Sequence, residues 1–303
     1  MWTSQPQCGN VGDTCVALAV QGEGRTMKVM PLDGRIGAEV DLDLKGPWTE
    51  TPGDVEELRA AFRNFHLLLF RDPDLEAADQ IRLVEALELV PDEWTNGEKF
   101  GFLSNQLEVA PNDGQHNAYL FHSDLMWKDQ PINSISLYAM VLPDEPAPTI
   151  FASGVGAAAS LPAELRARLD GERGLFLIDF TGGDKRYSEE TASQEAPRAT
   201  QSVLYDDPIS GQTSLVIDSL FFDKLVGWDR GDSEALRGQL HAYLYAPANL
   251  FQHDWQVGDL VIWNNVALQH ARPELPPTGE RTHRRVSGTY KVGTTAWDAS
   301  FRD

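Results

Sequence analysis

The chain has 303 residues, and 42% of them are hydrophobic, which is enough to build one large domain around its own core. Its 46 Asp and Glu residues outnumber its 25 Lys and Arg residues, so the formal net charge is −21. A surface this acidic repels polyphosphates and anionic lipids. We therefore expect neither a nucleic-acid-binding nor a membrane-surface protein. The sequence contains no run of 18 apolar residues that could form a transmembrane helix.

Residues 1–26 are expected to form an irregular extension, and residues 27–303 a single domain. The extension carries both cysteines, Cys8 and Cys15, but it lacks the basic and apolar segments of a secretory signal peptide. We therefore expect a cytoplasmic protein whose two thiols are reduced.

The first elements after the extension are two helices with a buried strand between them. The first helix begins near Pro52, the strand is the apolar run 66–72, and the second helix follows. Each helix is predicted from apolar residues at helical spacing, namely Val55, Leu58, Phe62 and Phe65 in the first and Ala77, Ile81, Val84 and Leu87 in the second.

From about residue 100 onward the pattern changes to short strands separated by turn residues. Strands are expected at 100–103, 135–142, 175–180, 201–205, 214–218, 259–263 and 284–292, and helices at 162–169 and 233–245. The polar stretch 181–200 is expected to be a loop. Because helices do not alternate with strands, a mainly antiparallel β core decorated by helices fits better than βαβ units. The absence of a Gly-rich phosphate loop argues against a nucleotide-binding fold.

The sharpest local feature is the pair His122 and Asp124. In an extended chain, residues two apart face the same side, so the imidazole and the carboxylate converge. His270 offers a third ligand, and two His with one carboxylate form the facial triad of non-haem Fe(II) oxygenases. The pair alone is weak evidence for a metal, because such a pair more often lies in a solvated loop or makes a structural hydrogen bond.

Two arginines strengthen the metal interpretation. Arg281 and Arg285 follow His270 by 11 and 15 residues in a strand-like segment, so both side chains can point to one face. Arginine is the natural bidentate partner of a carboxylate. With Arg284, they suggest an anion site in an otherwise acidic protein. The alternative is a surface cluster that neutralises Asp or Glu.

Several motifs together give the chain a resemblance to one family. It resembles the taurine dioxygenase and dichlorophenoxyacetate dioxygenase (TauD/TfdA) group of Fe(II)/2-oxoglutarate-dependent oxygenases, from about Ile36 to Val292. The motifs occur in the family's order, at 37–40 (GAEV), 67–72 (LLLFRD), 122–124 (HSD), 137–139 (LYA), 148–152 (PTIFA) and 258–263 (GDLVIW), and His270 with the paired arginines closes the series.

This resemblance implies a double-stranded β-helix, a jelly-roll or cupin-like core, with flanking helices. It implies that Fe(II) is held by His122, Asp124 and His270. The co-substrates would be O₂ and 2-oxoglutarate, whose distal carboxylate would be bound by Arg281 and Thr149. The family often uses the second arginine, here Arg285, for the acidic group of the prime substrate, although Arg285 could instead help to hold 2-oxoglutarate.

The chain departs from the family pattern at two places. Trp263-Asn264-Asn265 stands where Trp-Asp-Asn is usual, and loss of that carboxylate could alter the support of the ligands. The residues 145–148 (EPAP) replace the usual Gly-Gly-Asp and make a stiffer approach to Thr149.

Three further residues are candidate substrate contacts. Tyr119 precedes the His-x-Asp pair and Trp127 follows it, so either could line the cavity, although an aromatic side chain at position 119 could equally be core packing. Asn105 follows a strand signal and is as easily a loop residue as a substrate contact. The region 171–230 is expected to form part of the pocket and a lid that excludes water.

The leading functional hypothesis is a dioxygenase that hydroxylates, or otherwise oxidises, a small anionic molecule such as an amino acid, a sulfonate or a carboxylic acid, with release of succinate and CO₂. A second hypothesis keeps the same cofactors but acts on a larger or carrier-tethered natural-product intermediate by hydroxylation, desaturation or cyclisation. A third is a non-catalytic binding protein on the same fold, which the presence of His122, Asp124, His270 and Arg281 disfavours. The expected partner is a small molecule, and the sequence leaves open whether the protein is a homo-oligomer.

Overall fold

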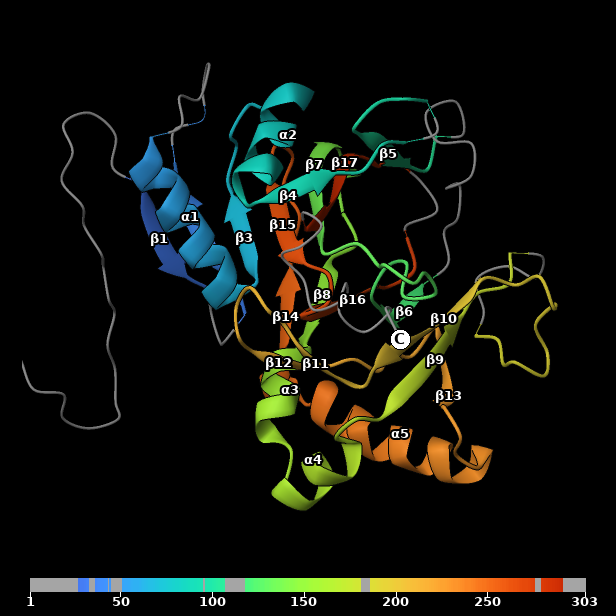
Figure 1. Cartoon of the computed structure of the whole chain (residues 1–303). Helices are drawn as coiled ribbons and strands as arrows, with labels where there is room; N and C mark the ends of the chain where they lie inside the picture. The colour runs from blue at the N-terminus through green and yellow to red at the C-terminus, as the bar shows by residue number, and fades with distance from the viewer. Residues whose placement is uncertain are drawn as a thin grey trace, which may run out of the picture.

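The computed structural model is a β barrel of the jelly-roll type with helices on its outside (Figure 1). The structure describes residues 27–32, 36–42, 44, 51–94, 96–106, 118–180, 186–275 and 279–290. The predicted extension 1–26, with its two cysteines, lies outside the described residues. The expectation of a mainly β fold with flanking helices is confirmed.

The larger layer is an eight-stranded sheet in the order β1-β2-β3-β15-β7-β17-β4, with β5 also paired to β17. Its pairs are antiparallel except for β2 with β3. The strands are β1 (Lys28–Pro31), β2 (Ala38–Asp41), β3 (Leu67–Phe70), β4 (Leu89–Pro91), β5 (Gly101–Ser104), β7 (Ser134–Val141), β15 (Leu260–Asn264) and β17 (Thr282–Tyr290).

The smaller layer is a four-stranded antiparallel sheet in the order β14-β8-β16-β6. Its strands are β6 (Tyr119–His122), β8 (Thr149–Ser153), β14 (Leu250–His253) and β16 (Leu268–Arg272). One apolar cluster joins the two sheets, because Leu69 and Trp263 of the larger sheet pack with Phe151 and Leu268 of the smaller one. Both sheets therefore contribute to the inside of the barrel, and side chains from both can reach a common site there.

The strand β3 shows why the sequence places helices on the outside of the larger sheet. Successive strand residues face opposite sides. Leu67 and Leu69 join the cluster between the sheets, while Leu68 and Phe70 join a second cluster that includes the helices α1 (Pro52–Phe65) and α2 (Ala77–Ala86). A strand that is apolar on both faces therefore needs a partner on each side (Figure 1).

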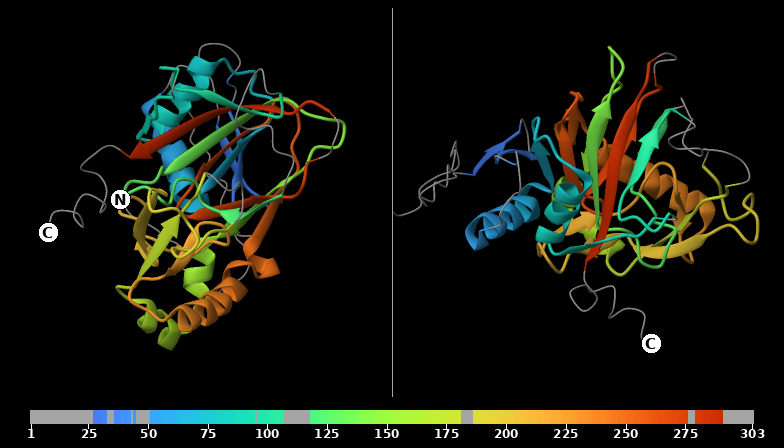
Figure 2. Two further views of the ribbon diagram at one scale, coloured as in Figure 1. Left: turned by 90° about the vertical axis from the view of Figure 1, so that its right-hand side faces the viewer. Right: turned by 90° about the horizontal axis from the view of Figure 1, so that it is seen from above.

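The remaining elements gather around a third apolar cluster, at the end of the barrel away from α1 and α2 (Figures 1 and 2). The helices there are α3 (Gly154–Ser160), α4 (Ala163–Leu169), α5 (Arg230–Leu244) and the 3₁₀ turn η1 (Pro247–Asn249). The strands are β9 (Arg173–Leu177), β10 (Arg198–Ser202), β11 (Leu204–Asp206), β12 (Thr213–Leu215) and β13 (Phe222–Leu225). Within the described residues, no helix is long and apolar enough to cross a membrane.

The observed elements correct some of the expected bounds. The predicted loop 181–200 ends earlier than expected, because residues 198–200 already belong to β10, paired with β9. The expected strand 214–218 is shorter, because β12 ends at Leu215. The sequence did not single out strands such as β13 (FDKL) and β14 (LFQH), since neither has an alternating or a continuously apolar pattern.

Candidate active site

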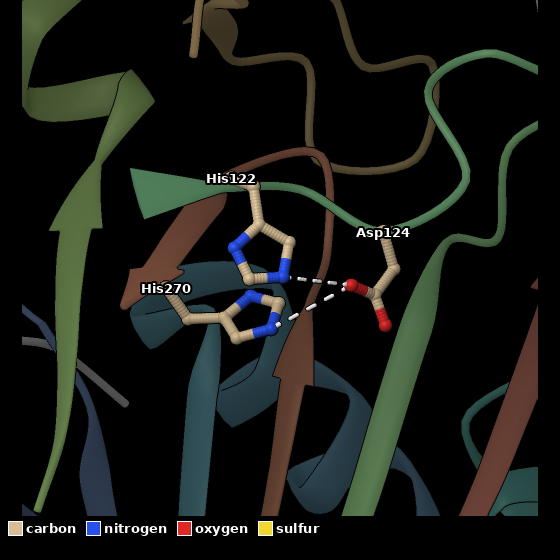
Figure 3. Close-up of side chains that lie close together, drawn as sticks. All are labelled: His122, Asp124 and His270. Atoms are coloured by element: carbon tan, nitrogen blue, oxygen red, sulfur yellow. Dashed lines mark ion pairs between the residues drawn. The ribbon is translucent and has the colours of Figure 1, made fainter. Parts of the chain in front are cut away.

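Three side chains that could bind one metal ion converge inside the barrel (Figure 3). His122 ends β6, Asp124 lies in the turn that follows, and His270 lies on β16 directly across from His122 in the strand pairing. One ligand atom from each residue can be chosen so that all lie within 4.8 Å of one another. The Nε2 atoms of His122 and His270 lie 3.1 and 3.7 Å from the same carboxylate oxygen of Asp124. The three residues that the sequence singled out thus lie close together, although Asp124 lies in a turn and not in the extended strand that the spacing argument assumed.

Hydrogen bonds outside the cluster hold its members in place. The Nδ1 atom of His122 lies 2.7 Å from the backbone oxygen of Leu120, an arrangement that leaves Nε2 to face the cluster. The buried side chain of Asn265 accepts a hydrogen bond from the backbone N–H of Asp124 at 2.9 Å and donates one to its carbonyl at 2.9 Å. Asn265 also donates to the carbonyl of Ile132. The side-chain amide of Asn265 therefore holds the backbone of the turn that carries Asp124.

The carboxylate of Asp124 is anionic because its charge is stabilised by Arg285 and His122. Burial favours the neutral acid, but the charge of Arg285, whose Nη2 lies 2.7 Å from Oδ2, and the hydrogen bond with His122 outweigh burial, so the pKa of Asp124 falls well below its ordinary value. Burial and the neighbouring His122 lower the pKa of His270 to about 3, so His270 is neutral. One anionic oxygen and neutral imidazole nitrogens are the donors of the facial triad that suits Fe(II). The residues present therefore fit this metal.

The cluster opens into a cavity of about 370 Å³. Its lining contains three arginines, several aromatic side chains and the three candidate ligands. Its lining residues are Leu103, Tyr119, His122, Asp124, Leu125, Trp127, Ile135, Leu137, Thr149, Ile178, Phe180, Leu220, Phe221, Trp263, His270, Arg272, Arg281 and Arg285.

Thr149 and Arg281 line this cavity together although 132 residues separate them in the sequence. Both are buried, and each can interact with a carboxylate, Thr149 through one hydroxyl and Arg281 through a guanidinium. The indole N–H of Trp255 donates to the hydroxyl oxygen of Thr149 at 2.9 Å. Since that oxygen already accepts from Trp255, its own proton is available to a ligand in the cavity.

Comparison with known proteins identifies the family of this chain. The family described as "Taurine catabolism dioxygenase TauD, TfdA family" matches residues 28–287. The chain belongs to this family. The predicted resemblance, and the expectation of a 2-oxoglutarate-dependent dioxygenase, are thereby confirmed.

Curated relatives align along nearly the whole chain. An alpha-ketoglutarate-dependent sulfate ester dioxygenase of Pseudomonas putida is 25% identical over 91% of this chain and 95% of its own length. A pentalenolactone F synthase of Streptomyces avermitilis is 26% identical over 90% of this chain and 97% of its own length. A solved taurine dioxygenase structure from Burkholderia xenovorans shares the fold, with a TM-score of 0.71 and 23% identity over 88% of this chain and 92% of that one.

The first departure from the TauD/TfdA pattern has a clear structural account. The side-chain oxygen of Asn264 accepts hydrogen bonds from the backbone N–H groups of Val266 and Ala267, each at 3.0 Å, and so shapes the turn between β15 and β16. A carboxylate can accept the same two bonds. Because the hydrogen bonds to the backbone of Asp124 come from Asn265, the exchange at position 264 leaves this support of the ligand in place.

The predicted substrate contacts separate into two groups. Tyr119 and Trp127 line the cavity, as does Arg285. Asn105 is not among the lining residues; its side chain donates to the carbonyl of Gly279 at 2.8 Å and accepts from the backbone N–H of Arg281 at 2.9 Å. It fixes the segment that carries Arg281.

Sequence reasoning missed several cavity residues, which come from the stretch 171–230. Ile178, Phe180, Leu220 and Phe221 all line the cavity. The carboxylate of Asp218 shapes the turn that holds Leu220 and Phe221 by accepting from the backbone N–H groups of residues 220, 221 and 222 at 2.6–3.0 Å. An Asp-Ser pair followed by three apolar residues is the signal that could have indicated a buried capped turn.

Proposed function

We propose that this protein is a non-haem Fe(II)- and 2-oxoglutarate-dependent dioxygenase with a single active site in the barrel. The observation that carries this proposal is the placement of His122, Asp124, His270, Thr149 and Arg281 around one cavity. In this proposal the first three residues hold the iron, and the last two hold the distal carboxylate of 2-oxoglutarate. Bound iron, with 2-oxoglutarate and O₂, supplies the oxidising chemistry, which yields succinate and CO₂.

The protein itself contributes orientation, charge and exclusion of water. Leu120 and Asn265 fix two of the three ligands, and Arg285 keeps the second oxygen of Asp124 occupied, so a single oxygen faces the two imidazoles. Trp255 donates to the hydroxyl oxygen of Thr149, which leaves the hydroxyl proton able to bond to a ligand in the cavity. The apolar side chains of Ile178, Phe180, Leu220 and Phe221 line the cavity, which supports the proposal that the region 171–230 contributes a lid.

We infer that the prime substrate is a small anionic organic molecule. A cavity of about 370 Å³ that also receives 2-oxoglutarate leaves room for a compact substrate, and its arginines favour an anion. The sulfate ester dioxygenase relative is named for a substrate of this kind. A larger natural-product intermediate is the second candidate, supported by the pentalenolactone F synthase relative. A purely binding function would not require three ligands held this closely. Neither a nucleic-acid nor a membrane partner is expected from the charge.

The test is substrate-stimulated formation of succinate by the purified protein with Fe(II), 2-oxoglutarate and a panel of small sulfonates and carboxylates. His122→Ala should abolish it, because two remaining ligands hold Fe(II) poorly. Asp129→Ala changes an exposed carboxylate of the same segment and should leave it unchanged. Full activity of His122→Ala would refute the iron assignment.

A further inference from the structure

Three buried rings pack next to one another beside Thr149. They are His253 at the end of β14, Trp255 in the loop that follows, and His283 on β17, and none of them is more than 4% exposed. Thr149 and Arg281 line the cavity, but the three rings are not among the lining residues. Any effect of the rings on a ligand must therefore pass through the side chains that do line the cavity.

The indole of Trp255 contacts both imidazoles. Its ring centre lies 4.5 Å from that of His253 at an interplanar angle of 85°, and 4.6 Å from that of His283 at 75°. Edge-to-face contacts of this kind favour one orientation of each ring. The indole N–H donates to the hydroxyl of Thr149 at 2.9 Å. The direction of this donor therefore depends on how the two imidazoles hold the indole.

The two imidazoles are themselves fixed by the fold. The Nε2 atom of His253 lies 3.2 Å from the carboxylate of Asp259, which also accepts from Arg71 at 2.6 Å. His283 is the second residue of β17, which pairs with β5 on one side and β7 on the other. Arg281 directly precedes this strand. The row of rings thus connects β14 with the segment that carries Arg281.

His283 contributes a neutral ring to this row. It is completely buried, and neither of its ring nitrogens has a hydrogen-bond partner within the described part of the chain. Burial and the positive charge of Arg281 lower the pKa of His283 well below its ordinary value. A neutral imidazole can pack against Trp255 without repelling the nearby guanidinium. Its contribution is therefore the shape of the ring.

We propose that His283 is a positioning residue for 2-oxoglutarate. It holds the indole of Trp255 from the side of β17, and so keeps the hydroxyl of Thr149 and the guanidinium of Arg281 in a fixed arrangement toward one carboxylate. This inference rests on the proposed function, in which these two residues bind the distal carboxylate of 2-oxoglutarate. Loss of the ring should weaken recognition of that carboxylate and leave the binding of Fe(II) unchanged.

The test compares two probes that share a 2-oxo acid end and a five-carbon chain. 2-Oxoglutarate carries the distal carboxylate, and 2-oxopentanoate ends in a methyl group instead. Their dissociation constants are measured on the full-length protein with Fe(II) under anaerobic conditions, from the visible absorption band. The wild type should prefer 2-oxoglutarate. His283→Asn removes the ring and should reduce this preference at least about fivefold, by weakening the binding of 2-oxoglutarate alone.

Two further variants and one control sharpen the result. His283→Leu, which fills the volume of the imidazole without a flat ring, should behave as His283→Asn does. His283→Phe restores a flat neutral ring and should keep the preference within about twofold of the wild type. The matched control is His66→Asn, because His66 is also a buried imidazole whose pKa is lowered by burial, but it ends α1 and does not line the cavity. It should leave both affinities unchanged.

The outcomes separate this inference from the function on which it rests. If the band forms in the wild type but His283→Asn and His283→Leu keep the wild-type preference, the positioning role is wrong and the proposed function stands. Equal weakening of both probes in these variants would also refute the positioning role, because the ring would then serve the fold as a whole. A preference lost in His283→Phe would refute the contact with Trp255 as its cause. No band in the wild type with either probe would refute the proposed function, and this inference with it.

Discussion

Exchange of Asn265 for aspartate is predicted to damage the metal site, whereas the same exchange at Asn264 is predicted to be tolerated. The two residues are adjacent and both are buried. They differ in how they use their side chains. Asn264 accepts two backbone hydrogen bonds, while Asn265 accepts one and donates two.

The magnitudes follow from this difference. Asn264→Asp keeps both accepted bonds and makes them charge-assisted, which offsets the cost of burying the carboxylate, so we expect a change of within about 1 kcal/mol in the free energy of unfolding. Asn265→Asp removes both donated bonds at about 1 kcal/mol each and turns a buried carboxylate toward the carbonyls of Asp124 and Ile132. The repulsion and the unpaired groups bring the expected loss to at least about 3 kcal/mol.

Denaturant unfolding measures the free energy of unfolding of each variant. Anaerobic titration with Fe(II) in the presence of 2-oxoglutarate measures the affinity of each variant for Fe(II). Asn265→Asp should lose both stability and affinity for Fe(II), because the turn that carries Asp124 is no longer clamped. Asn264→Asp should bind Fe(II) as the wild type does. Equal behaviour of the two variants, or greater damage from Asn264→Asp, would refute the assignment of ligand support to Asn265.

Three other predictions concern the co-substrate, the pH dependence and the scaffold. Trp255→Phe removes the N–H that donates to the hydroxyl of Thr149. The 2-oxoglutarate concentration needed for half-saturation should therefore rise about fivefold, while Fe(II) binding is retained. An unchanged 2-oxoglutarate requirement would show that Thr149 does not depend on the hydrogen bond from Trp255. Burial lowers the pKa of His122, but the hydrogen bond and charge of Asp124 outweigh it and raise the pKa above 6.5. Protons therefore compete with the metal, and affinity for Fe(II) should fall by up to about tenfold per pH unit as the pH drops below that pKa; a flat profile in the same assay would contradict this. Gly238 lies in the interior of α5, where an added Cβ meets no atom within 4 Å. Gly238→Ala should therefore raise the free energy of unfolding by about 0.5–1 kcal/mol, measured by denaturant unfolding. A loss of stability would contradict the placement of Gly238 in an open position of a helix.

The parts of the fold that the sequence predicted are those with a local signal. The helix α1 has apolar residues at helical spacing, a Pro at its first position and a capping threonine, Thr51, whose side chain accepts from the backbone of Asp54. The strand β3 is a run of four buried apolar residues. In both, a pattern of neighbouring residues indicates the element, and the structure confirms it.

The rest of the site depends on contacts between distant residues. The indole of Trp255 meets the hydroxyl of Thr149 across 106 residues, and the amide of Asn265 meets Asp124 across 141. No local pattern predicts such a contact, because only the pairing of strands brings the partners together. The candidate ligands were indicated by the spacing of His122 and Asp124 and were supported by the resemblance to a known family, whereas Arg272 was missed because a single arginine after a histidine is not a signal.

The measurement that tests the central claim most directly is an anaerobic titration of the apoprotein with Fe(II) and then 2-oxoglutarate, followed by absorption spectroscopy. If His122, Asp124 and His270 hold iron beside the site of Thr149 and Arg281, a visible metal-to-ligand charge-transfer band should appear at one equivalent of each. In Arg281→Ala the band should require far more 2-oxoglutarate at an unchanged Fe(II) requirement. Absence of the band in the wild type, with both components in excess, would contradict the iron–2-oxoglutarate account.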